Sequence, residues 1–232
     1  MSLARLRGFG SAMEMLLYPE RMDVALYRRA MDTLLEEAKP VARQLLRLRK
    51  RLWGVDQLYP YDLWAPLVDQ SEQISFAEAG DLLRSALAPQ GQEYVQVIDT
   101  ALRERWVDRA DNQGKFPLPI CPFQYGVHPF VLTNWNDKLS DAMILSHELG
   151  HAVHSLLIHQ NQSIGDSEFG GNSAFGYLAA ETASTANEWL CCQYLSASTD
   201  QGKALPRPAI CWRLVSRLCS RRCSCMEGST NG

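Results

Sequence analysis

The sequence predicts a mainly α-helical fold with a small edge β-strand region. Two segments without proline, residues 140–159 and 177–195, repeat apolar residues at three- and four-residue steps, as helices packed against a core do. A short β-rich segment, residues 126–134, is bounded by Gly126 and Asn134 and predicts a strand. With 232 residues, 46% of them hydrophobic, the chain is long enough to bury a sizeable core.

Residues 147–151 read His-Glu-Leu-Gly-His and lie within the first of these predicted helices. Residues four apart share one helix face and stand about 6 Å apart along the axis. His147 and His151 can therefore both reach one tetrahedral zinc ion, and Glu148 can take a proton from water beside it. This is the H-E-x-x-H pattern of zinc peptidases. The alternative is that both histidines are ordinary helix residues.

Local signals around this motif give two further expectations. Asp137 or Ser140 is expected to cap the start of the helix. Gly150 is a poor helix former, costing roughly 1 kcal/mol against alanine. We therefore expect Gly150 to let another backbone approach the helix closely.

A zinc site that acts on substrate needs a third protein ligand and an open fourth position. The downstream carboxylates within reach are Asp166, Glu168, Glu181 and Glu188. Glu181 is the favoured ligand because it lies on the predicted helix 177–195, whereas Glu168 lies in a glycine-rich segment.

Two residues are expected to support the site without binding the metal. Glu188, two turns beyond Glu181, is expected to hold a ligand imidazole in one tautomer. His154 is expected to support a ligand or to pack, rather than to coordinate. The alternative for Glu181 and Glu188 is a solvated helix face. The apolar residues of the same helix can face a core: Leu178, Ala179, Ala186, Trp189 and Leu190.

Residues 23–53 predict a long helix that is interrupted at Pro40 and ended by Gly54. Its leucines are expected on buried faces (Leu34, Leu35, Leu45, Leu46 and Leu48), and its basic residues on a solvated face (Arg43, Arg47, Arg49, Lys50 and Arg51). Residues 76–87 and 92–108 predict two more helices.

Pro129 predicts that the strand at residues 126–134 lies at the edge of a sheet, because proline has no N–H to donate to a neighbouring strand. Such an edge either pairs with an extended peptide by strand addition or is hidden by a loop, and the sequence does not choose between these. The glycine-rich residues 165–176 predict a connector, with a flap over the metal as the alternative.

Composition limits the partners and the compartment. A net charge of −3 argues against a strong polyanion partner, so no nucleic-acid partner is expected. No apolar run is long enough to cross a bilayer, and the first residues lack a secretory hydrophobic region, so no membrane partner is expected. Seven cysteines at irregular spacing predict a reducing, cytoplasmic location rather than a disulfide framework. The oligomeric state is not predicted.

The chain resembles the oligoendopeptidase F branch of the thimet-oligopeptidase family of zinc metallopeptidases. The resemblance rests on residues 145–154, 180–188 and 128–135, with weaker matches at 3–9 and 61–67. It implies a long-helix, zincin-like catalytic domain that cleaves short peptides within a deep channel. It also implies His147, His151 and Glu181 as ligands of Zn²⁺, and Glu148 as the catalytic base. Substrate-binding residues cannot be assigned.

The expected organisation has three parts. Residues 1–112 form a helical portion of the catalytic domain, and residues 113–195 form the zinc-binding core. Residues 196–232 form a basic, cysteine-rich tail that is expected to be disordered, and the resemblance is expected to stop where it begins. The catalytic domain is thus expected to be incomplete at its C-terminus. Two functions follow: a zinc-dependent endopeptidase of short oligopeptides, or an impaired fragment that keeps the zinc site and only binds peptide or a partner.

Overall fold

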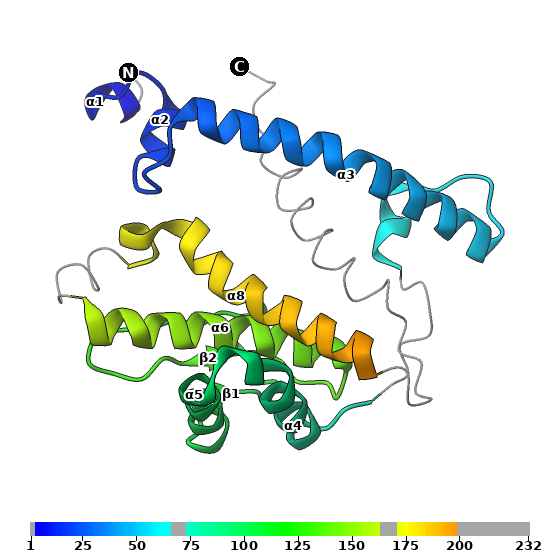
Figure 1. The fold of residues 1–232 in the computed structure, drawn as a ribbon, viewed down its shortest axis with the longest axis vertical. Helices are drawn as coiled ribbons and strands as arrows, with labels where there is room; N and C mark the ends of the chain where they lie inside the picture. Colours follow the sequence, from blue (N-terminus) through cyan, green and yellow to red (C-terminus); the bar gives the residue numbers. More distant parts are fainter. Residues whose placement is uncertain (1–2, 66–72, 163–170, 199–232) are drawn as a thin grey trace. The chain divides into compact units, whose positions relative to one another are not determined.

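The fold is mainly helical, as expected, in a computed structural model that describes residues 3–65, 73–162 and 171–198 (Figure 1). The α-helices are α1 (Leu3–Leu6), α2 (Ala12–Leu17), α3 (Val24–Trp53), α4 (Phe76–Leu87), α5 (Gln92–Arg103), α6 (Leu139–Asn161) and α8 (Gly171–Ser198). Two 3-10 turns, Pro60–Trp64 and Ala88–Gln90, and two short strands, β1 (Val107–Asp108) and β2 (Val131–Leu132), complete the described elements. None of the described helices has the length and hydropathy that a membrane crossing needs.

The described residues fall into two compact units. Residues up to Asp69, together with residues 172–178, form the first unit, and the other described residues from Gln70 onward form the second. Unit 1 therefore contains α1 to α3, and unit 2 contains α4 to α6 and most of α8. The expected division at residue 112 stays a prediction, and residues 199–232 and 163–170, on which the disordered tail and most of the flap were expected, lie outside the described residues.

In unit 1, α3 is defined by strong local signals at both ends. The Asp23 carboxylate accepts from the backbone N–H of Leu26 at 2.6 Å, and Gly54 ends the helix in the left-handed conformation at φ 63°, as expected. The expected interruption at Pro40 was wrong, since the helix runs through it. Pro40 and Glu36 are both exposed, so the carbonyl that loses its intrahelical partner lies at the surface.

Two expectations about the faces of α3 were also wrong. Leu34 and Leu35 are exposed, at 49% and 53%, although Leu45 is buried. Arg49 is buried at 2% rather than solvated. Its guanidinium donates to the carbonyls of Asp62 at 3.1 Å and Ala65 at 2.8 Å and lies over the ring of Trp53, so it anchors the following 3-10 turn to the helix.

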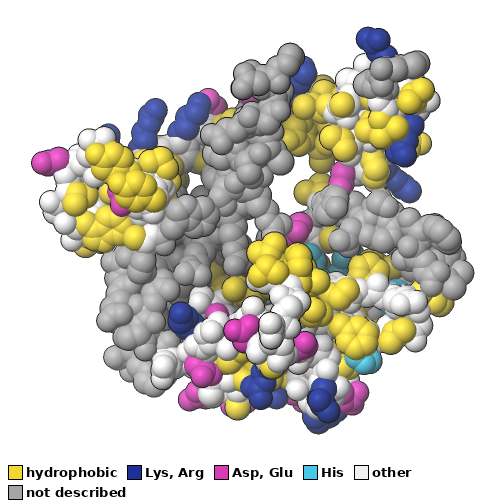
Figure 2. All heavy atoms as spheres, turned by 180° about the vertical axis from the view of Figure 1, so that it is seen from behind, with side chains coloured by type: hydrophobic (Ala, Val, Ile, Leu, Met, Phe, Trp, Pro, Cys, Tyr) yellow, Lys and Arg dark blue, Asp and Glu magenta, His cyan; other side chains and the backbone are white. Residues whose placement is uncertain are grey.

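Unit 2 is built around one hydrophobic core. Side chains from α4, α5, α6 and α8 fill it, and the largest fully buried ones are Leu83, Leu87, Ile98, Leu145 and Leu149. The outer surface of α4 and α5 carries charges of both signs (Figure 2). There Arg84 donates to Asp81 at 2.7 Å and to Asp99 at 2.6 Å.

The predicted helix 76–87 is confirmed, with Ser75 and Glu78 forming a capping box. The predicted helix 92–108 was too long. It ends at Arg103, and Arg105 adopts a left-handed φ of 64° that turns the chain. Residues 107–108 then form β1 instead of continuing the helix.

The predicted strand is shorter than expected, and of the two alternatives for its edge the structure shows the one in which a loop covers it. β2 pairs in parallel with β1 on one side, where the N–H of Val131 donates to the Trp106 carbonyl at 2.8 Å. On its other side Leu132 exchanges two hydrogen bonds with Ile120, at 2.9 and 3.1 Å. Both sides of β2 are therefore occupied, which excludes strand addition at β2 itself.

Candidate metal centre

The two motif histidines face each other on α6. Their Nε2 atoms lie 3.2 Å apart, and the ring planes meet at 82°. The side chains are only 13% and 20% exposed, for His147 and His151 respectively. The helix therefore presents two imidazole nitrogens side by side in a partly sheltered position.

A carboxylate from α8 joins them. Glu181 Oε2 lies 3.4 Å from His147 Nε2 and 3.8 Å from His151 Nε2. These three residues form the group whose ligand atoms all fall within 4.8 Å of one another, among the residues that the structure describes. Glu181 is also held in place locally, because its carboxylate accepts from the Ser184 hydroxyl at 3.0 Å.

The donor set fits zinc by distance as well as by type. Zinc binds imidazole nitrogen and carboxylate oxygen at about 2.0–2.2 Å in a tetrahedron, which places neighbouring donor atoms roughly 3.4 Å apart. The three observed separations, 3.2, 3.4 and 3.8 Å, bracket that value. The side chains would need to shift by only roughly a few tenths of an ångström to surround one ion.

Glu188 lies behind His147. Its Oε1 is 2.5 Å from His147 Nδ1, and its side chain is 7% exposed. An ionised carboxylate only accepts hydrogen bonds, so it suits a ring nitrogen that carries a proton, and the other ring nitrogen, Nε2, lies on the side of Glu181 and His151. Because Glu188 is buried, the alternative of a solvated face was wrong for this residue.

Glu148 is buried at 5% on the same helix. Burial and, to a lesser degree, the Glu148 carboxylate raise the pKa of the Cys121 thiol, so these two groups are electrostatic neighbours. Cys121 was not a predicted site residue. Its only sequence signal is its position ahead of the predicted strand, and such a signal cannot show that the segment folds back onto α6.

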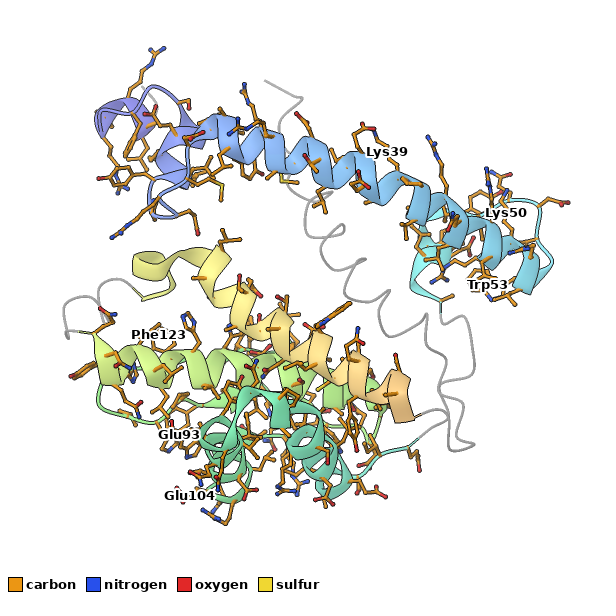
Figure 3. All side chains as sticks on the ribbon, in the orientation of Figure 1. Lys39, Lys50, Trp53, Glu93, Glu104 and Phe123 are labelled. Atoms are coloured by element: carbon orange, nitrogen blue, oxygen red, sulfur yellow. The ribbon has the colours of Figure 1, made fainter. Side chains whose placement is uncertain are left out.

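The other histidines remain outside the group of three. His154 is half-buried, and burial lowers its pKa. His128 stacks on Trp106 at 4.9 Å between ring centroids. His159 lies 5.6 Å from Phe123 and 5.5 Å from Tyr125, near the C-terminal end of α6 (Figure 3).

The close meeting of α6 and α8 brings the carboxylates to the rings. A Cβ at Gly150 would lie 2.7 Å from Ser184 Cα and 2.8 Å from the Ala183 carbonyl oxygen, so the expected close backbone approach is confirmed.

The start of α6 differs from expectation, because Lys138 is the N-cap and the Asp141 carboxylate accepts from its N–H at 3.2 Å.

Two apolar residues of α8, Leu178 and Trp189, do not face the core as expected, although Leu190 packs against it. The polar residues Ser184, Asn187 and Glu188 of α8 are buried, whereas Trp189 and Leu178 are 56% and 59% exposed. Asn187, which was not predicted as a site residue, is fully buried beside Glu188. Its only sequence signal is an asparagine inside a helix, where this residue is unfavourable unless its side chain is bonded.

Known proteins resemble this chain over most of its length. The model of "Peptidase family M3" matches residues 1–223, which extends the resemblance beyond the expected limit of 195. Oligopeptidase PepF of Bacillus subtilis is 33% identical over 201 residues, covering 86% of this chain and 29% of its own length. The chromosomal oligoendopeptidase F of Lactococcus lactis subsp. cremoris is 30% identical over 190 residues, covering 80% and 30%.

A solved structure from Chlamydophila abortus has a TM-score of 0.73 and 25% identity, covering 93% of this chain and 35% of that one. The chain thus spans about 30% of the length of the curated relatives it matches. The family model covers nearly all of this chain, and several of the relatives are named oligoendopeptidase F. The chain therefore belongs to peptidase family M3, in its oligoendopeptidase F branch.

Proposed function

We propose that this chain carries the metal centre of a zinc-dependent endopeptidase that hydrolyses peptide bonds in short oligopeptides. The observation that supports this most directly is the convergence of His147, His151 and Glu181 at separations of 3.2–3.8 Å. Two imidazoles and one carboxylate leave a fourth tetrahedral position open, as in zinc sites that act on substrate.

Each residue has a distinct role in this proposal. His147, His151 and Glu181 hold the ion, and Glu188 keeps the His147 ring in the tautomer that coordinates. A bound zinc ion supplies acidification of water and polarisation of the substrate carbonyl. Glu148 accepts the proton of the attacking water and returns it to the leaving amine, so one carboxyl acts first as base and then as acid.

The substrate class is proposed from the relatives. The Bacillus subtilis protein is named an oligopeptidase and the Lactococcus lactis protein an oligoendopeptidase. We propose short peptides as substrates here, without assigning substrate-binding residues. We also propose residues 113–195 as the metal-binding core, residues 1–112 as a helical portion of the same domain, and a cytoplasmic location.

The test measures zinc and turnover together. The purified chain is expected to contain zinc by mass spectrometry and to cleave an internally quenched peptide until a chelator is added. Glu148→Gln is expected to keep the zinc and to lose roughly 10²–10⁴-fold in rate, the usual contribution of a general base. The control is Glu104→Gln, since Glu104 is an exposed glutamate at the end of α5. Equal rates in Glu148→Gln and Glu104→Gln would contradict the role of Glu148.

A second candidate follows from the length comparison. The chain spans 29% of the Bacillus subtilis relative yet contains the whole group of three metal-ligating residues. It could therefore bind zinc and peptide, or a partner, without turnover. A folded, zinc-loaded chain that binds a peptide but cleaves none would favour this candidate over the endopeptidase.

A further inference from the structure

Asn187 connects three helices of unit 2 through its side-chain amide. Its Nδ2 donates to the backbone carbonyl of Ser146 on α6 at 3.0 Å, and its Oδ1 accepts from the Tyr94 hydroxyl on α5 at 2.7 Å. Asn187 and Ser146 are both fully buried. Ser146 immediately precedes the motif residue His147, and Asn187 immediately precedes Glu188.

The Ser146 residue receives a second contact from α8. Its hydroxyl lies 3.1 Å from the thiol of Cys191, one turn beyond Asn187. Burial raises the pKa of this thiol to about 11, so it stays a neutral hydrogen-bonding group. Two polar contacts of α8 thus converge on one residue of α6, next to the point where Gly150 lets the helices meet.

These contacts fix the axial position and the rotation of α8 relative to α6. One residue of helix corresponds to 1.5 Å of rise and 100° of rotation. A shift of that size would break the 3.0 Å bond to Ser146 and the 2.7 Å bond from Tyr94, and it would turn Glu181 and Glu188 away from the rings. An apolar side chain at position 187 would fill space but would not specify one setting, since dispersion contacts have no direction.

We propose that Asn187, held by Tyr94, is a positioning residue for the metal centre, because its bond to the Ser146 carbonyl sets Glu181 and Glu188 against His147 and His151. This inference rests on the proposed zinc site. Asn187 touches neither metal nor substrate. It acts through the register of α8, so its loss should lower zinc affinity in a chain that is still folded.

The test compares zinc affinity among four variants of the full chain, measured by competition with a chelating dye. Asn187→Leu removes both hydrogen bonds, and Asn187→Asp keeps the acceptor for Tyr94 but loses the donor to Ser146. Both are expected to weaken zinc binding roughly 10–100-fold, as outer residues of metal sites commonly do. Tyr94→Phe removes one hydroxyl and is expected to cost roughly three- to tenfold.

The control is Ile98→Val, which shortens a fully buried side chain on the same helix as Tyr94 and leaves the hydrogen bonds of the Asn187 side chain in place. It is expected to lower stability and to leave zinc affinity unchanged. The absorption spectrum of bound Co²⁺ gives a second readout, which should change in Asn187→Asp and Tyr94→Phe and not in Ile98→Val. Because Tyr94→Phe alters a single atom, it keeps the test decisive if Asn187→Leu does not fold.

The outcomes separate this inference from the function on which it rests. A wild-type chain that takes up no zinc overturns the proposed metal centre and the inference together. Zinc binding by the wild type that is equally tight in Asn187→Asp and Tyr94→Phe overturns the inference alone. Weaker binding in these variants, with unchanged binding in Ile98→Val, supports it.

Discussion

The helices α3 and α6 are both long, but they are stabilised in opposite ways. Only two of the 30 residues of α3 are buried, whereas 11 of the 23 residues of α6 are. α3 has an aspartate cap, a left-handed glycine and great length, which are properties of its own sequence. α6 has no side-chain cap from its N-cap residue and depends on the helices packed around it. A helix that depends on neighbours can have polar side chains held at fixed positions, and the candidate site lies on such a helix.

The largest expected difference comes from shortening a leucine in each helix. Leu145 on α6 is fully buried, whereas Leu34 on α3 is 49% exposed. Leu145→Ala should lower the free energy of unfolding of unit 2 by about 3 kcal/mol, because it removes buried methyl groups and leaves a cavity. Leu34→Ala should change that of unit 1 by less than about 0.5 kcal/mol. Hydrogen exchange with mass spectrometry reports the two helices separately, and equal losses would contradict the contrast.

Zinc should stabilise only one of the two helices. A ligand that binds the folded state at 100 times its dissociation constant stabilises it by about 2.7 kcal/mol. The protection of α6 amides, and of α8 amides around Glu181, should rise by that amount on zinc addition. Protection of α3 should not change, because no residue of α3 belongs to the group of three ligating side chains. A rise in both helices would show that zinc acts outside the proposed centre.

Adding a methyl group at Gly150 of α6 and at Gly54 after α3 should again affect the two helices differently. At Gly150 the added Cβ meets backbone atoms of α8 at 2.7 and 2.8 Å, and backbone cannot move aside cheaply. Gly150→Ala should therefore destabilise unit 2 by about 2 kcal/mol, despite the better helix propensity of alanine. At Gly54 nothing lies within 4 Å, and the penalty is only the left-handed φ of 63°, about 1 kcal/mol.

These two glycine variants should also differ in zinc affinity. Gly150→Ala pushes α8 away from α6 and should weaken zinc binding, whereas Gly54→Ala should leave it unchanged. Competition with a chelating dye measures both. Unchanged zinc affinity in Gly150→Ala would mean that the helix contact does not set the ligand geometry.

The same contrast explains which features the sequence could predict. The cap at Gly54, the helix 76–87 and the histidine pair depend on spacing within one segment, and the structure places them as expected. The end of the helix after Arg103 depends on pairing between β1 and β2, which are far apart in the sequence. Periodicity cannot report a pairing of that kind.

The polarity of a residue did not predict which side chains of α8 are buried, for a physical reason. Trp189 was expected to face the core because it is apolar, but it is exposed, whereas the neighbouring polar residue Glu188 is buried. A carboxylate can be buried when an imidazole nitrogen lies 2.5 Å away, and that partner comes from another helix. The surroundings of Asn187 and Cys121 could not be predicted for the same reason, since the neighbouring groups Ser146 and Glu148 lie 41 and 27 residues away along the chain.

The smallest expected effect concerns pH. Burial lowers the pKa of His154 below its ordinary value of 6.5, because the charged imidazolium loses water. The unfolded chain then binds the proton more readily than the folded chain. His154 therefore contributes fully to stability above about pH 6.5, and this contribution is lost as the pH falls from there through the lowered folded value.

This pH effect can be isolated by substitution and by region. In metal-free protein, His154→Gln should make the stability of α6 less dependent on pH between about pH 5 and 7 than it is in the wild type. The effect should be small, since His154 is only half-buried. The α3 segment contains no histidine and should show no histidine-linked change in that window, which provides the internal reference. Identical pH dependence of α6 in wild type and His154→Gln would mean that His154 gains a proton as easily in the folded chain as in the unfolded one.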